Sequence, residues 1–177
     1  MVVSAEIGHS YSISALVDYP ANVGSLTVRA AVPVAAPMAT VWSIAVNWEA
    51  HSRWVPLTTV TVVQDCGGLG TRFVGRTGVG PLAFDDPMTV TVWQPPHLGS
   101  AVSTCTVTKT GRVVTGTAGF TVTETSSTTC QLEWFEDIDI RPIALVRLMA
   151  PVLRPLARAG LRQTLHKLAQ DAEAIAG

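Results

Sequence analysis

The sequence predicts an α+β domain in which one antiparallel sheet is closed by a long C-terminal helix. Between residues 26 and 140, apart from two short helices, apolar and polar residues alternate in segments separated by turn residues, which is typical of strands. From Arg141 to Gly177, apolar side chains instead recur at helical spacing on one side. Because such a helix needs a broad apolar surface to cover, we expect the sheet to curve around it, and this arrangement can enclose a cavity.

The first expected strand is Leu26–Val32, where apolar residues alternate with Thr27 and Arg29. Two short helices follow it. Pro37 suits the first turn of a helix that runs to about Asn47. A second helix is expected over Trp48–Trp54, and Pro56 closes it because the residue before a proline disfavours helix.

Six further strands are expected before the terminal helix. Their successive hairpins imply an antiparallel sheet, and we expect this sheet to contain about six to seven strands. A loop through Gly78–Pro87, with Asp85 and Asp86, is expected between the second and third of these six. The six segments are 57–64, 71–77, 88–93, 101–109, 112–124 and 129–140.

The terminal helix is predicted to be kinked at its start, because Pro142, Pro151 and Pro155 interrupt it. Its regular part is expected to begin near Val152. The apolar stripe that should face the sheet consists of Leu161, Leu165, Leu168, Ala172 and Ile175.

The chain of 177 residues is expected to form one domain over residues 25–177, with residues 1–24 as an N-terminal arm or extra edge strand. Charged residues make up 14% and hydrophobic residues 47%, against about 25% charged in an average soluble protein. This excess favours additional apolar lining around a pocket. A membrane span is disfavoured, because the longest apolar run, Ala30–Val46, carries Pro33 and Pro37 and is shorter than the roughly 20 residues needed.

Three cysteines without a CxxC motif argue against a disulfide framework or a zinc ribbon. The N-terminal residues do not show the basic segment followed by an apolar core that is typical of a secretory signal. A cytoplasmic location is therefore expected. Charge is unevenly spread: six basic and two acidic residues from Arg141 onward give +4, while six basic and eleven acidic residues before it give −5. The basic residues of this helix could contact an anionic lipid surface, or they could simply form the solvent-exposed side of a packed helix. They are too few and too localised to predict nucleic-acid binding.

Three phrases, together with the order of elements, resemble the START-like helix-grip (SRPBCC) superfamily, whose bacterial members are often labelled polyketide cyclase/dehydrase. They are Ala36–Trp42 (APMATVW), Trp48–Trp54 (WEAHSRW) and Gly70–Phe73 (GTRF). The resemblance covers Ser25–Ala176 and implies a helix-grip fold with a deep apolar cavity between the sheet and the last helix. It implies no single reaction, since its members include lipid carriers, hormone receptors, aromatases and cyclases.

Glu136 is the first candidate for chemistry, because it shares a strand face with Leu132, Trp134 and Ile138. If this face points inward, Glu136 is a carboxylate in an apolar lining and could act as a general acid or base. Alternatively it binds the ligand, or it has a structural role, either at the solvated mouth of the sheet or paired with an arginine such as Arg72 or Arg76.

His51 is the second candidate, since in a helix-grip fold the short helix that carries it borders the mouth of the cavity. The alternative is a surface or capping histidine. Asp85 and Asp86 could belong to a lid or simply solvate a loop. The histidines lack metal-ligand spacing, and no nucleotide, flavin or nicotinamide motif is present, so no metal or cofactor is predicted.

Large apolar side chains are expected to line the cavity, with His51, Arg72, Arg76 and Glu136 as polar groups that orient the ligand. The alternative is that these side chains fill a solid core. The small residues Gly116 and Ala118 on an inward face favour open space instead. The predicted apolar ligand-binding residues are Trp54, Phe73, Phe84, Met88, Val90, Phe120, Trp134, Leu161 and Leu165.

Three functions follow from these features. The first is binding of a hydrophobic small molecule such as a lipid, polyketide, aromatic or isoprenoid metabolite, by a monomer or homodimer. The second is a cyclase or dehydratase in which Glu136 or His51 transfers protons. The third is a membrane- or protein-docking module that uses Arg154, Arg158 and Arg162 of the terminal helix.

Overall fold

The computed structural model describes residues 25–177, and within the C-terminal helix it describes side chains from residue 155 onward. The N-terminal arm or extra edge strand expected over residues 1–24 lies outside the described residues.

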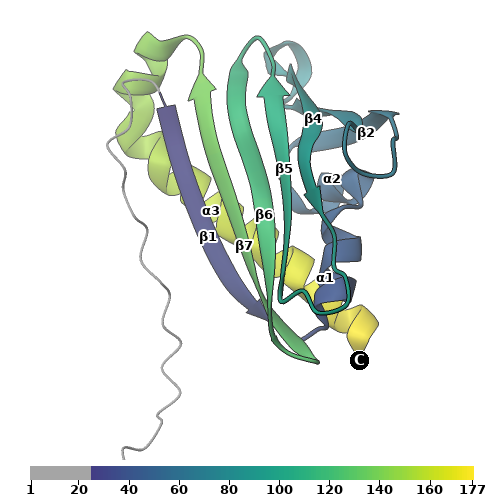
Figure 1. The fold of residues 1–177 in the computed structure, drawn as a ribbon. Coiled ribbons are helices and arrows are strands. Elements are labelled where there is room, and N and C mark those ends of the chain that lie inside the picture. The colour runs from purple at the N-terminus through teal and green to yellow at the C-terminus, as the bar shows by residue number, and fades with distance from the viewer. Residues whose placement is uncertain (1–24) are drawn as a thin grey trace, which may run out of the picture.

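The described chain forms seven strands, three α-helices and two short 3-10 helices (Figure 1). The α+β class and the order of elements are therefore as predicted. In chain order the elements are β1 (Ser25–Val34), α1 (Met38–Ala45), η1 (Trp48–Ala50), α2 (His51–Trp54), β2 (Thr58–Gln64), β3 (Arg72–Thr77), η2 (Gly80–Leu82), β4 (Phe84–Gln94), β5 (Val102–Thr110), β6 (Val114–Ser126), β7 (Thr129–Ile140) and α3 (Ile143–Ala176).

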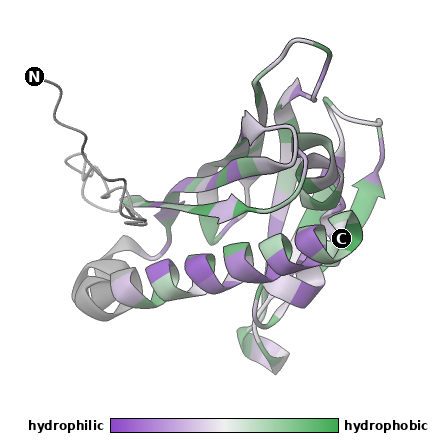
Figure 2. Ribbon diagram, turned by 90° about the horizontal axis from the view of Figure 1, so that it is seen from below, coloured by the Kyte–Doolittle hydropathy of each residue, from purple (hydrophilic) through white to green (hydrophobic). Residues whose placement is uncertain are grey.

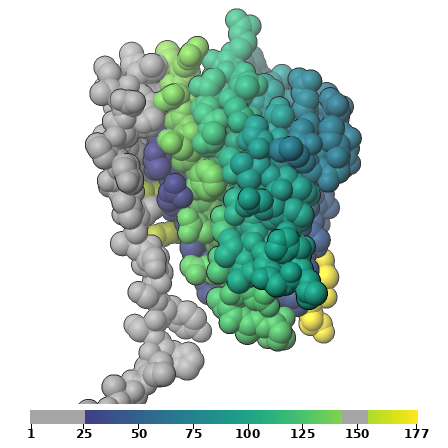
Figure 3. Space-filling view, in the orientation of Figure 1, coloured from purple at the N-terminus to yellow at the C-terminus, as the bar shows by residue number. Residues whose placement is uncertain are grey.

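The seven strands form one antiparallel sheet in the order β1-β7-β6-β5-β4-β3-β2. The first strand therefore pairs with the last one along the chain, and β2 forms the opposite edge. The sheet curves around α3, which crosses its inner face (Figure 1). Figure 2 shows hydrophilic residues on the solvent-facing side of α3, and Figure 3 shows the outer face of the sheet.

Two predicted boundaries were wrong. Strand β4 begins at Phe84, so Asp85 and Asp86 belong to a strand and not to a loop. Pro87 is tolerated there because the pairing of β4 with β5 begins only at Met88, so Pro87 pairs with β3 alone. Helix α3 begins at Ile143, nine residues before the expected start of its regular part.

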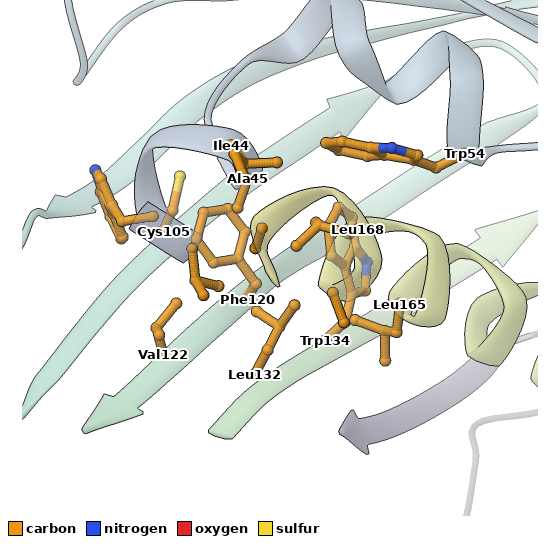
Figure 4. Packing of buried hydrophobic residues seen from close by; sticks show 14 of the residues in the cluster. Ile44, Ala45, Trp54, Cys105, Phe120, Val122, Leu132, Trp134, Leu165 and Leu168 are labelled. Carbon is orange, nitrogen blue, oxygen red and sulfur yellow. The ribbon is translucent and has the colours of Figure 1, made fainter. Parts of the chain in front are cut away.

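The solid part of the core lies where α1 and the C-terminal half of α3 meet the sheet (Figure 4). Leu165, Leu168 and Ala172 of the predicted stripe are completely buried there. Ile175 does not belong to this contact: it is 70% exposed, because the last turn of α3 projects past α1 (Figure 1). No helix in the described part of the chain is both long and apolar enough to cross a membrane.

Two hydrogen bonds tie α2 to α3. The Trp54 Nε1–H donates to Asp171 Oδ2 at 2.9 Å, and Thr164 Oγ1 donates to the Trp54 carbonyl oxygen at 3.3 Å. A third bond joins α3 to the end of β1, where the Ala35 N–H donates to Glu173 Oε1 at 2.9 Å. These bonds fix the position of α3 across the sheet.

Candidate functional site

A cavity of about 380 Å³ lies between the inner face of the sheet, α2 and α3. It occupies the end of the sheet where β1, β4 and β6 begin, while the solid core fills the other end. Its volume falls within the roughly 300–1,000 Å³ of small-molecule sites. The space between sheet and helix is therefore partly open.

Most of the predicted apolar residues do line this cavity. They are Phe73, Phe84, Met88, Phe120, Trp134 and Leu161. The inward alternation of each strand places the first five of them there, and the side of α3 that faces the sheet supplies Leu161.

Trp54, Val90 and Leu165 do not line the cavity, although all three are buried. Trp54 is held against α3 by its hydrogen bond to Asp171. Val90 and Leu165 belong to the solid core. Their predicted place in the lining is therefore corrected: burial alone does not separate a cavity wall from a filled interior.

Arg72 and Arg76 also lie away from the cavity. Both are exposed, because Phe73 and Gly75 take the inward positions of β3 and the arginines alternate with them. The Arg76 guanidinium pairs with Asp85 on the outer face, with Nη1 and Oδ1 2.8 Å apart. Their predicted contact with a ligand in the cavity is corrected on this ground.

Glu136 lies in the cavity wall, on the inward face of β7 that also carries Leu132, Trp134 and Ile138. The neighbouring residue on β6 is Ala118, whose small side chain leaves the carboxylate open to the cavity. The placement follows the alternation of the strand, and its role stays a prediction.

His51 lines the cavity and is only 6% exposed. Its Nε2 lies 2.8 Å from the Ala45 carbonyl oxygen, which can only accept, so the proton sits on Nε2 and the lone pair on Nδ1. The rings of Trp48, Trp54 and Trp134 surround it at centroid distances of 5.5, 5.2 and 5.5 Å. Burial, the largest cause, lowers the pKa of His51 from 6.5 to about 4, although the bond to Ala45 opposes this shift. The imidazole is therefore neutral at pH 7.

Sequence reasoning missed the most polar part of the wall, a buried ion pair between Lys109 and Asp86. The Lys109 Nζ lies 2.6 Å from Asp86 Oδ2, and the two residues are 8% and 7% exposed. The ammonium also lies 3.6 Å from the Met88 sulfur. One signal was present in the sequence, since Lys109 continues the inward alternation of Cys105 and Val107 on β5.

Two opposing effects act on the Lys109 ammonium. Burial, the largest, disfavours its charged form, but the Glu136 and Asp86 carboxylates together outweigh burial and raise the pKa of Lys109 above 10.5. Lys109 is therefore a cation at neutral pH and a poor nucleophile. One end of the apolar cavity thus carries one ammonium and two carboxylate side chains.

Two buried polar atoms of the wall residues have no hydrogen-bond partner in the described part of the chain. They are Asp86 Oδ1, an acceptor, and Trp134 Nε1, a donor. A buried polar atom without a partner is unfavourable by about 1–3 kcal/mol. Such atoms in a cavity wall are candidates for contact with a ligand.

Similar folds occur among solved structures. The Zhui aromatase/cyclase of Streptomyces sp. R1128 is 17% identical, with a TM-score of 0.61 over 84% of this chain and 94% of that one. A protein of Thermus thermophilus is 14% identical, with a TM-score of 0.66 over 86% and 100%. A norcoclaurine synthase point mutant of Thalictrum flavum, in complex with a transition-state analogue, is 14% identical, with a TM-score of 0.55 over 83% and 95%.

These identities are low, so the likeness shows the helix-grip fold alone. No curated protein sequence matches the chain. The family model for polyketide cyclase/dehydrase and lipid transport proteins matches residues 25–173, nearly all of the described domain. The chain therefore belongs to the polyketide cyclase/dehydrase and lipid transport family.

Proposed function

We propose that this protein binds a hydrophobic small molecule, such as a lipid, polyketide, aromatic or isoprenoid metabolite, between the sheet and α3. The observation that carries the proposal is the cavity of about 380 Å³, whose wall is mainly apolar with a few polar groups at one end. Burial of apolar ligand surface would drive binding at about 25 cal/mol per Å². The polar groups would set the ligand's orientation.

Family membership supports this proposal, because the description of the family includes lipid transport. One similar structure is that of an aromatase/cyclase, and a ring-containing ligand would fit the aromatic wall formed by Trp48, Phe73, Phe120 and Trp134. The chemical class of the ligand is part of the proposal.

The test is native mass spectrometry of the protein as purified from cells, with organic extraction of any adduct. We expect a bound hydrophobic metabolite in the wild-type protein and its loss in Ala118→Phe, which fills the cavity from β6. The matched control is Thr121→Phe on the outward face of the same strand, which should keep the adduct. A clean unliganded mass, with no thermal shift across a lipid and polyketide panel, would contradict binding.

A second candidate function is proton-transfer catalysis of the cyclase or dehydratase type, and the position of Glu136 in the cavity wall favours it. His51 suits this role less well, because a base with a pKa of about 4 is weak at neutral pH. Glu136→Gln should then abolish turnover of a bound polyketide while its affinity survives. Unchanged turnover would remove Glu136 from the mechanism.

The docking hypothesis stays a prediction of the sequence. Arg162 is exposed on α3, but the side chain of Arg154 lies outside the described residues. The structure therefore adds no observation that favours it over ligand binding.

A further inference from the structure

We propose that the ligand carries a hydroxyl group, as an alcohol or phenol, which binds between Asp86 and Lys109 while its apolar skeleton fills the rest of the cavity. This inference rests on the proposed binding function and specifies the chemical class of the ligand. Four steps support it.

The first step is the unpaired oxygen of Asp86. Oδ2 accepts a hydrogen bond from the Lys109 ammonium at 2.6 Å, whereas Oδ1 is buried and has no donor among the residues that the structure describes. A carboxylate oxygen can only accept hydrogen bonds. The ligand group that completes this site must therefore be a donor.

The second step is the hydrogen-bonding capacity of Lys109. An ammonium has three N–H donors. One points to Asp86 and one approaches the Met88 sulfur at 3.6 Å, so a third remains for an acceptor on the ligand. A hydroxyl group satisfies both residues at once, since it donates to Oδ1 of Asp86 and accepts from Nζ of Lys109.

The third step is the charge of this end of the cavity. Asp86 and Glu136 carry two carboxylates against the single ammonium of Lys109, and all three residues line the wall. A ligand carboxylate would add a third negative charge and cannot donate to Asp86. A ligand ammonium could donate, but it would bring a second cation against the Lys109 ammonium and leave the third N–H of Lys109 without an acceptor. A neutral hydroxyl avoids both conflicts and loses the least hydration energy on burial.

The fourth step is the distance from the ion pair to the aromatic wall. Cys105 lies four residues before Lys109 on β5. It is the pairing partner of Phe120 on β6, and Phe120 is the pairing partner of Trp134 on β7. At about 3.4 Å per residue, Phe120 and Trp134 of the aromatic wall lie roughly 14 Å along the strand direction from the ion pair. A flat skeleton of two or three rings with a terminal hydroxyl spans this distance.

The test compares four probes that share one skeleton: 2-naphthol, naphthalene, 2-naphthoate and 2-naphthylmethylamine. Their affinities for the wild-type protein are measured at pH 7 by titration calorimetry, supported by quenching of tryptophan fluorescence. We expect 2-naphthol to bind about tenfold or more tightly than naphthalene, the gain typical of a hydrogen bond to a charged group. The naphthoate should bind most weakly.

A double variant, Asp86→Leu with Lys109→Met, removes both charges, and such a replacement of a buried ion pair is often neutral or stabilising. It should still bind naphthalene but lose the preference for 2-naphthol. The control is Arg76→Gln with Asp85→Asn, which removes the exposed ion pair on the outer face of β3 and β4. It should retain the preference.

The outcomes separate the two proposals. If the wild-type protein binds 2-naphthol and naphthalene equally, bound water satisfies Asp86, and the hydroxyl inference fails while the cavity stands. Tighter binding of the naphthoate or of the amine would also overturn it. If none of the four probes binds the wild-type protein, the proposed binding function fails, and the inference falls with it. The wild-type comparison decides the matter even where the double variant does not fold.

Discussion

Lys109 on β5 and Asp86 on β4 form an ion pair of 2.6 Å inside the wall of a mainly apolar cavity. Each side chain is withdrawn from water, so Asp86 depends on Lys109 for compensation of its charge, and Lys109 depends on Asp86 together with Glu136. This relationship makes the pair sensitive to the loss of one partner and tolerant of the loss of both.

Removal of one partner should strongly destabilise the fold. Lys109→Met alone should lower the free energy of unfolding by about 3–5 kcal/mol, because the Asp86 carboxylate stays buried without its partner. Asp86→Leu should lower it by less, because Glu136 still compensates the Lys109 ammonium. The double variant should come close to the wild-type value. Urea unfolding at pH 7 measures all four proteins. A double variant no more stable than the singles would show that the pair is not an energetic unit.

His51 should make the stability depend on pH between about 4 and 6.5. Its folded pKa of about 4 lies below the ordinary value of 6.5, so the unfolded state takes up the proton first as the pH falls. Stability is therefore lost as the pH drops through this window, by about 3 kcal/mol.

The comparison that isolates this effect is His51→Gln, whose amide N–H can replace Nε2 as donor to the Ala45 carbonyl. The difference in unfolding free energy between wild type and variant should shrink by about 3 kcal/mol from pH 7 to pH 4, measured by urea unfolding. A difference that stays constant would mean that His51 does not titrate in this way.

Strand periodicity predicts half of the candidate site. Alternation puts Leu132, Trp134 and Glu136 on one face of β7, and this face points into the interior in the structure. Such alternation depends only on local backbone geometry, which neighbouring residues in the sequence determine. It does not decide which face of a short strand turns inward when arginines and apolar residues alternate, and Arg72 and Arg76 were misplaced for this reason.

The ion pair was beyond the reach of local patterns. Asp86 precedes Pro87, a signal typical of loops, and only the tertiary pairing of β4 with β3 makes it part of a strand. Its proximity to Lys109, 23 positions further along, depends on the register of β4 with β5. A single sequence does not reveal this register, and the open space between sheet and helix is likewise a property of the packed fold.

The attachment of α3 should depend on Asp171 and not on its surface partner. Asp171→Ala leaves the buried Trp54 N–H without an acceptor, so it should lower the free energy of unfolding by roughly 1–3 kcal/mol. Arg53→Ala removes the ion pair of 3.5 Å between Arg53 and Asp171, whose side chains are 67% and 40% exposed, together with the contact of the Arg53 guanidinium over the Trp54 ring at 6.0 Å. Because these contacts are exposed, the variant should change stability by less than about 1 kcal/mol. Urea unfolding of the two variants checks this contrast. Equal losses would mean that the ion pair holds the helix.

Two alanine-to-leucine variants should separate the cavity from the solid core. Ala118 is buried but faces the cavity, which has room for the larger side chain of Ala118→Leu. This variant should therefore keep the wild-type free energy of unfolding within about 1 kcal/mol. Ala45 is buried in the packed contact of α1, so Ala45→Leu should lower the free energy of unfolding by about 1–3 kcal/mol.

Ligand binding should change in the opposite sense. Ala118→Leu should weaken the binding of naphthalene at least tenfold, because the leucine side chain fills the site, while folded Ala45→Leu should retain naphthalene binding. Urea unfolding and titration calorimetry measure both effects, and an Ala118→Leu variant as unstable as Ala45→Leu would indicate that the space between sheet and helix is filled.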